Sequence, residues 1–213
     1  MDQTDRDVPT PATADASAGA ASGRLGALMA AVKAAGGRGP APVDTWNPPD
    51  CGDMDMRIAA DGTWFYGGTP IGRVALTKLF ASVLTREGER FVLKTPVEKI
   101  GIQVEDAPFL AVDLAVEDAD AGPVLVFRTN MDDLVRAGPG HELRFAPGAE
   151  PGELRPYVHV RFGLEARLTR AVYLDLVERG EVRSCDGVPM FGVASGAAFY
   201  PMMPAAGLDL VSV

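Results

Sequence analysis

Residues 51–84 constrain the fold more than any other stretch, because they combine a hairpin signal with a helix signal. Apolar and polar side chains alternate over 54–59, and Asp61-Gly62 then supplies the positive-φ residues of a two-residue hairpin turn before the aromatic run 64–66. Thr69-Pro70 predicts a helix start, since a Thr hydroxyl can cap free amides and Pro needs no amide hydrogen at the first helical position. The stretch predicts a strand, a tight turn, a second strand and a helix.

This first helix has a single apolar stripe and a possible counterpart later in the chain. Apolar residues recur at helical spacing, and Gly88 is placed to end the helix; the stripe comprises Leu76, Leu79, Phe80, Val83 and Leu84. Aligning Gly88 with Gly180 places Leu76 on Leu168 and Leu84 on Leu176, within the run RFGLEARLTRAVYLDLVERG. The shared order of elements predicts a duplicated unit of two strands, a helix and two strands.

Strand-like runs greatly outnumber helical ones. Further runs lie at 91–94, 100–105, 109–116, 124–128, 141–145, 155–162, 190–194 and 197–202. Most are joined by turns of hairpin length, which favours a mostly antiparallel α+β fold over a parallel α/β sheet. We expect a mobile N-terminal arm (1–45) with a short helix after Ser22, one α+β unit (46–107) and a second (108–213).

Composition excludes several classes of function. The net charge of −9 disfavours nonspecific binding to nucleic acids or anionic membranes. Two cysteines are too few for a disulfide framework, two histidines leave little for a metal site, and no apolar run is long enough to span a membrane. Acidic first residues disfavour a signal peptide. These features predict a cytoplasmic protein without membrane contact.

Several separate motifs resemble those of a bacterial family known as domain of unknown function 1285. They are CGDMDMRIAADGTWFYGGTPIGR, LKTPVEKIGIQVEDAPF, FRTNMDD and VRFGLEARLTRAVY, and the resemblance extends over residues 47–202. It implies a duplicated α+β core whose second half is superficially similar to pleckstrin-homology domains. It also implies a ligand site between the halves, a nucleotide-like ligand and a role in signal transduction, whereas no catalytic activity comes with it.

The densest cationic stretch of this acidic chain contains Arg155, Arg161, Arg167 and Arg170. Guanidinium groups can bind phosphate through two hydrogen bonds, and free amides at a helix start also favour an anion. We therefore predict that Arg161, Arg167 and Arg170 bind a ligand. Glu165 lies among them, so ion pairs within the protein are the structural alternative.

Four further residues are candidates for the same ligand site. Thr129, Asn130 and Lys99 lie at strand ends, where their polar groups can point at a ligand. Turn formation is the structural alternative for the 129–133 segment. Trp64 could stack on a nucleobase, although aromatic strand residues more often fill a core.

Other chemistry has weaker support in the sequence. Asp50, Asp53 and Asp55 could bind a metal, but the glycine and terminal glutamate of a calcium loop are missing. Cys185 near Arg183 could be oxidation-prone. We expect a non-enzymatic protein that holds a phosphorylated or nucleotide-like molecule between its halves, with no catalytic residue and no metal assigned. A metal-assisted enzyme acting on a phosphorylated metabolite and a protein-interaction module are the alternatives.

Overall fold

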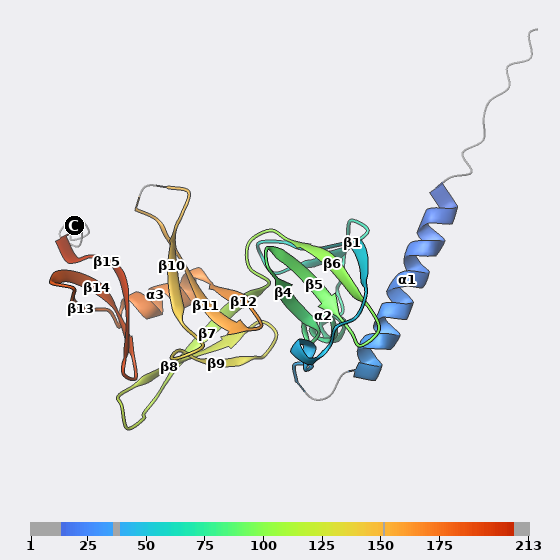
Figure 1. The fold of residues 1–213 in the computed structure, drawn as a ribbon. Coiled ribbons are helices and arrows are strands. Elements are labelled where there is room, and N and C mark those ends of the chain that lie inside the picture. Colours follow the sequence, from blue (N-terminus) through green and yellow to red (C-terminus); the bar gives the residue numbers. More distant parts are fainter. Residues whose placement is uncertain (1–13, 36–38, 151, 207–213) are drawn as a thin grey trace, which may run out of the picture.

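The protein is an elongated chain of sheets and helices. The structure is a computed structural model that describes residues 14–35, 39–150 and 152–206. Figure 1 shows α1 (Ala14–Ala35) at one end, followed by a first sheet, a second sheet and a small third sheet at the other end. We call residues 50–104, which hold the first sheet, the first unit, and residues 109–204 the second unit.

The first sheet has six strands with two parallel strands at its centre. A short 3₁₀ turn, Val43–Thr45, leads into it. In spatial order the strands are β3 (Thr69–Pro70), β2 (Trp64–Tyr66), β1 (Asp50–Ile58), β6 (Lys99–Val104), β5 (Arg90–Lys94) and β4 (Leu84–Glu87). Strands β1 and β6 pair in parallel, and the other neighbours pair antiparallel.

The second sheet repeats this topology. Its spatial order is β10 (Leu143–Pro147), β11 (Leu154–Arg161), β12 (Leu164–Leu168), β7 (Phe109–Glu117), β8 (Val124–Thr129) and β9 (Leu134–Arg136). As in the first sheet, the first and the sixth strand in chain order pair in parallel at the centre. The prediction of a mostly antiparallel, strand-rich α+β fold is therefore confirmed.

The first predicted helix is shorter than expected. Helix α2 spans Val74–Ala81, whereas Thr69–Pro70 forms the edge strand β3. The predicted cap at Thr69 is therefore wrong, and the actual N-cap, Arg73, makes no side-chain capping hydrogen bond. Gly88, with φ of 63°, lies in the hairpin turn between β4 and β5 and does not end the helix. The apolar spacing could not show where the helix ends. Val83 and Leu84, the last two residues of the predicted stripe, are fully buried although they lie beyond α2, at the start of β4.

The second helix occupies a different place in its unit. Helix α3 spans Arg170–Val177, and its N-cap Thr169 accepts a hydrogen bond from the Val172 amide at 3.5 Å. It follows the sixth strand of its sheet, whereas α2 lies between the third and fourth strands of its own. Two strands precede and two strands follow each helix along the chain, as the predicted ββαββ order requires, but the aligned helices occupy different places relative to their sheets. The likeness of the units lies in their strand order.

Helix α1 packs on the first unit through its second half. Leu28 and Val32 are fully buried there, which agrees with the predicted apolar stripe, but the helix begins well before Ser22. Its predicted end at Gly36-Gly37, most of the remaining arm and the chain beyond residue 206 lie outside the described residues. No helix in the described part of the chain is long and apolar enough to span a membrane.

Within the second unit, the third sheet is joined to the second sheet through buried contacts. It is an antiparallel meander of β13 (Glu181–Cys185), β14 (Val188–Ser195) and β15 (Ala198–Pro204). Buried Ser195 links β14 to the second sheet, because its hydroxyl donates to the Ala137 carbonyl at 2.7 Å and accepts from the Leu125 amide at 3.0 Å.

Candidate functional site

A groove lined by three arginines lies where β11, β12 and the start of α3 meet. It has a volume of about 460 Å³. We call it the arginine groove, and its lining comprises Glu153, Leu154, Arg155, Pro156, Arg167, Leu168, Thr169, Arg170, Tyr173 and Leu174. The structure thus brings Arg167 and Arg170 together, as the sequence predicted, and adds Arg155.

The strand register explains how the arginines reach the groove. Arg167 lies opposite Tyr157 on the neighbouring strand, so Arg155 lies two positions further along the same face of β11. Side chains between them point to the other face, toward α3. Arg170 is the first residue of α3, directly after the Thr169 cap. Strand alternation thus puts the Arg155 and Arg167 side chains on the sheet face opposite to α3, and the helix cap puts Arg170 at the start of α3; all three residues line the same opening.

The groove has an excess of positive charge. Glu153 is the one carboxylate among its lining residues, and it lies 4.0 Å from the Arg155 Nε atom, at the limit of an ion pair. Exposed Arg170 has no ion pair with any described residue. Tyr173 closes one wall, and burial raises the pKa of its hydroxyl, which therefore stays protonated at neutral pH. An anion can therefore bind Arg170 in the groove without breaking an ion pair of that residue.

Arg167 also connects the groove to the first unit. Its Nη2 atom donates to the Ala60 carbonyl at 2.8 Å, and its Nη1 atom lies 3.0 Å from the Asp106 carboxylate. Asp106 also accepts a hydrogen bond from the Tyr157 hydroxyl at 2.7 Å. The pKa of Tyr157 is raised by burial and by this carboxylate. A single guanidinium group therefore belongs to the groove and to the junction of the two units.

Arg161 lies apart from the other arginines, at the junction itself. Its guanidinium pairs with Asp133 at 2.6 Å, donates to the Ala81 carbonyl of α2 at 3.1 Å and lies 4.9 Å above the Phe109 ring. Only 12% of its side chain is exposed. Arg161 thus fastens β11 to α2, which is the ion-pairing role that the sequence left open as the structural alternative.

A second, smaller cavity of about 340 Å³ lies beside Arg161, between α2 and the 129–133 turn. Its two cations are both paired, Lys78 with Asp132 and Arg161 with Asp133. Lys78 lowers the pKa of Asp132 through this contact. Because positive and negative side chains balance here, the cavity is a weaker anion site than the arginine groove.

Thr129 and Asn130 hold the turn beside that cavity. The fully buried Thr129 hydroxyl accepts from the amides of Met131 and Asp133 at 3.2 and 3.1 Å. The Asn130 carbonyl oxygen Oδ1 accepts from the Leu110 amide at 3.0 Å. The Thr129 hydroxyl therefore binds its own turn, in agreement with the turn alternative, whereas Asn130 binds the backbone of the neighbouring strand β7.

Lys99 and Trp64 lie in the first unit. The Lys99 ammonium lies 2.6 Å from Glu87, which also pairs with Lys94. The Trp64 ring is only 1% exposed and stacks on Phe80 of α2, with ring centroids 6.2 Å apart. Neither residue lines the arginine groove.

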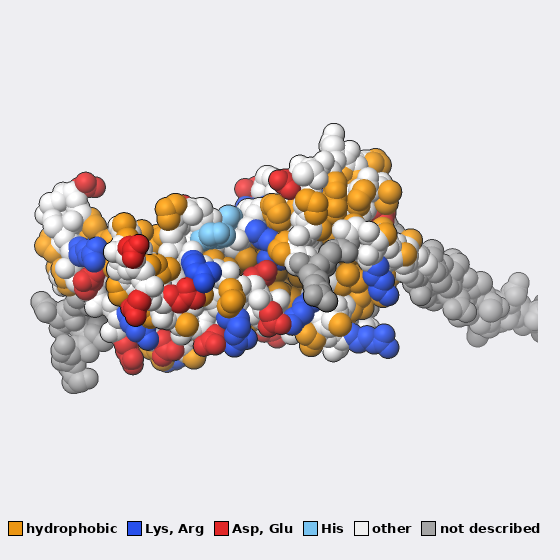
Figure 2. Space-filling view, turned by 90° about the horizontal axis from the view of Figure 1, so that it is seen from below, with side chains coloured by type: hydrophobic (Ala, Val, Ile, Leu, Met, Phe, Trp, Pro, Cys, Tyr) orange, Lys and Arg blue, Asp and Glu red, His pale blue; other side chains and the backbone are white. Residues whose placement is uncertain are grey.

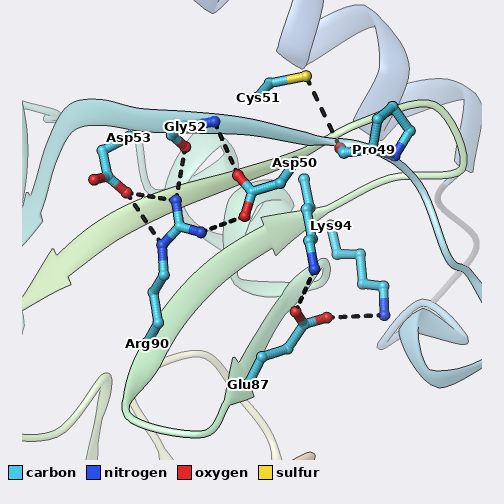
Figure 3. Close-up of polar contacts among 9 residues, drawn as sticks. Pro49, Asp50, Cys51, Gly52, Asp53, Glu87, Arg90 and Lys94 are labelled. Atoms are coloured by element: carbon cyan, nitrogen blue, oxygen red, sulfur yellow. Dashed lines mark hydrogen bonds and ion pairs between the residues drawn. The ribbon is translucent and has the colours of Figure 1, made fainter.

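The acidic cluster at the start of β1 binds a guanidinium group. Figure 3 shows Asp50 and Asp53 on either side of Arg90, whose Nη2 atom also donates to the Gly52 carbonyl at 3.0 Å. Arg90 lowers the pKa of Asp50. Among the described residues, no group of three or more His, Cys, Asp or Glu side chains is placed to hold a metal ion.

Charges of both signs are interspersed over the second unit on the face shown in Figure 2. Arg183, which could have activated Cys185, pairs with Glu181 at 2.6 Å. The sequence analysis missed Tyr173 and Leu174 as lining residues. Their spacing of three and four positions from Arg170 was a usable signal, because such residues share one helix face.

Known proteins resemble this chain in sequence and in fold. The model of the N-terminal domain of domain of unknown function 1285 matches residues 41–107, and that of the C-terminal domain matches residues 108–202. A crystal structure of a member of this family from Silicibacter pomeroyi DSS-3 is 49% identical, with a TM-score of 0.78, over 85% of this chain and 97% of that one.

A second solved member, from Shewanella baltica OS155, is 31% identical over 59% of this chain and 91% of that one, with a TM-score of 0.47. No curated protein matches the chain. The two domain models together span most of the sequence, as the motifs predicted. The chain therefore belongs to the family of domain of unknown function 1285.

Proposed function

We propose that this protein is a non-enzymatic, cytoplasmic ligand-binding protein that holds a small phosphorylated molecule in the arginine groove. The observation that carries the proposal is the gathering of Arg155, Arg167 and Arg170 around one opening in a chain whose net charge is −9. Isolated surface arginines are common, but three that converge on a groove with one weakly placed carboxylate are suited to binding an anion.

Phosphate fits this lining better than other small anions. Each guanidinium can donate two parallel hydrogen bonds to phosphate oxygens, and three such groups more than balance the charge of about −2 on a phosphate group. The Thr169 hydroxyl and the first amides of α3 lie at the same opening and supply further donors. We place the nucleotide-like ligand expected for this family in this groove, which lies within the second unit, whereas the sequence predicted a ligand between the two halves.

Ligand binding would act on the junction of the two units through Arg167. This guanidinium pairs with Asp106 and donates to the Ala60 carbonyl, so a phosphate in the groove competes with both for it. By thermodynamic linkage, a ligand that draws Arg167 into the groove weakens its hold on the first unit, and a weaker hold strengthens ligand binding. Such competition provides a route for signal transduction.

Two further inferences accompany the proposal. The common strand order supports a duplication of one six-stranded unit, and the similarity of the second unit to pleckstrin-homology domains stays a prediction. The metal-assisted enzyme is the weaker alternative, because the Asp50 and Asp53 carboxylates both bind Arg90.

The test is a calorimetric titration of the full chain with inorganic pyrophosphate, compared with an Arg170→Gln variant. Arg179→Gln is the matched control, because it removes the same charge from an exposed position near the other end of α3, outside the groove. We expect saturable binding that Arg170→Gln weakens about tenfold and that Arg179→Gln leaves within twofold. Equal losses in both variants, or no saturable binding to the wild type, would refute the proposal.

A further inference from the structure

The arginine groove has an apolar wall beside its cationic one. Leu154, Pro156 and Leu168 line it from β11 and β12, and Tyr173 and Leu174 line it from α3. Leu174 is the exposed member of this apolar wall, with a fractional exposure of 52%. An exposed leucine at the rim of a concave site is a surface that an apolar group of a ligand can cover.

The two walls are arranged side by side. Side chains alternate along a strand, so Leu154 and Pro156 share one face of β11 and Arg155 points to the other face. On α3, Arg170 and Leu174 are four residues apart and therefore lie on the same face, about one turn from each other. An occupant whose phosphate contacts Arg170 has its next group within reach of Leu174.

The volume also exceeds what a phosphate group alone requires. At about 460 Å³, the groove lies in the range of sites that hold small organic molecules, roughly 300–1,000 Å³. Its apolar residues come from two strands and a helix, so they enclose this space from more than one side. Water alone would leave this apolar surface solvated, whereas an apolar group would displace that water favourably.

We infer that the natural occupant is a phosphate monoester that carries an apolar group close to its phosphate. This inference rests on the proposed function and adds the class of molecule. The phosphate binds Arg170 and draws the guanidinium groups of Arg155 and Arg167 toward it, and the attached group covers Tyr173 and the exposed Leu174 on α3. Free phosphate, pyrophosphate and small polar phosphate esters bind more weakly, because they leave the apolar wall in water.

The test compares phenyl phosphate with methyl phosphate, which carries the same anionic group and lacks the ring. Both are titrated by calorimetry into the wild type, Leu174→Ser and the control Leu134→Ser. Leu134 is a leucine with 65% exposure on β9, the edge of the second sheet opposite to β10. Since both leucines are exposed, neither change removes a core contact, and circular dichroism verifies that each variant is folded.

We expect phenyl phosphate to bind the wild type about tenfold more tightly than methyl phosphate, the factor that 1.4 kcal/mol produces. This preference falls severalfold in Leu174→Ser and is unchanged in Leu134→Ser. Equal affinity of the two esters for the wild type would overturn the inference and leave the phosphate site standing. A preference that survives Leu174→Ser would also overturn it. Failure of both esters and of pyrophosphate to bind would overturn the proposed function as well.

Discussion

Replacing Arg161 by Met tests whether this arginine fastens the two units together. The substitution keeps a long apolar side chain over the Phe109 ring but removes the ion pair with Asp133 and the hydrogen bond to the Ala81 carbonyl. The two charged side chains are only 12% and 19% exposed, so they form a largely buried pair. Removing one partner leaves the Asp133 charge in a poorly solvated place.

The expected loss can be estimated from that burial. Breaking a buried ion pair by removing one partner costs about 3–5 kcal/mol. Asp133 is partly solvated and keeps the Thr129 hydroxyl at 3.3 Å, so we expect the lower end, about 3 kcal/mol. The double variant Arg161→Met/Asp133→Asn should lose less than the sum of the two single variants, because it leaves no unpaired charge.

Urea denaturation measures this loss. Circular dichroism follows both units. Tryptophan fluorescence follows the first unit and the segment just before it, since the two tryptophans are Trp64 and Trp46. With a slope of about 2–3 kcal/mol per molar urea, a loss of about 3 kcal/mol lowers the midpoint by roughly 1–1.5 M. Arg170→Met is the control, and it should change the free energy of unfolding by less than about 0.5 kcal/mol because Arg170 is exposed. A loss below about 1 kcal/mol for Arg161→Met would refute the fastening role.

Three other changes test the described contacts. Thr129→Val should lower the free energy of unfolding by about 2 kcal/mol, because two buried amides lose their acceptor, and a Thr129→Ser variant should retain most of the stability in thermal unfolding. Gly62→Ala should cost about 1–3 kcal/mol in urea denaturation, since φ is +83° and a Cβ would lie 2.9 Å from Asn130 Nδ2. Lys99 and then Lys94 hold the pKa of Glu87 below its ordinary 4.5, so this carboxylate stabilises the fold above pH 4.5 and the contribution disappears as the pH falls further. Glu87→Gln should therefore flatten the acid limb of the stability profile, and an unchanged limb would contradict the role of that pair.

The strand-rich class of the fold could be predicted from local signals, but the ends of α2 could not. Asp61-Gly62 marks a turn by its own chemistry, and Gly62 does have a positive φ of 83°. The predicted two-residue turn is wrong, because Asp61 does not have a positive φ and residues 60–62 form the loop, which the bond from the Ala59 amide to the Thr63 carbonyl closes. Thr69-Pro70 carries an equally local signal for a helix start. It forms an edge strand instead, because Phe65 and Tyr66 pair with it in the sheet. Tertiary pairing decided between two locally acceptable structures there.

The sequence placed Arg167 and Arg170 near each other, but it could not show the partners of side chains whose contacts are distant in sequence; ligand binding at these residues stays a prediction. Arg167 and Arg170 do converge on one groove, as a cationic run in an acidic chain predicts. The Arg161 partners are distant in sequence, since Asp133 lies in the turn before β9 and the Ala81 carbonyl lies in α2 of the first unit, so no local pattern could predict them. Composition likewise could not show that Trp64 is buried against α2.

The most direct measurement of the central claim is an NMR titration that follows the arginine Nε–Hε signals while pyrophosphate is added to the full chain. We predict that the signals of Arg155, Arg167 and Arg170 shift along one saturation curve, because these side chains share one groove. The Arg161 signal should stay in place, since its guanidinium is held by Asp133 and the Ala81 carbonyl. Saturable shifts at Arg161 without shifts at Arg170, or no saturable shift at any arginine, would contradict the account.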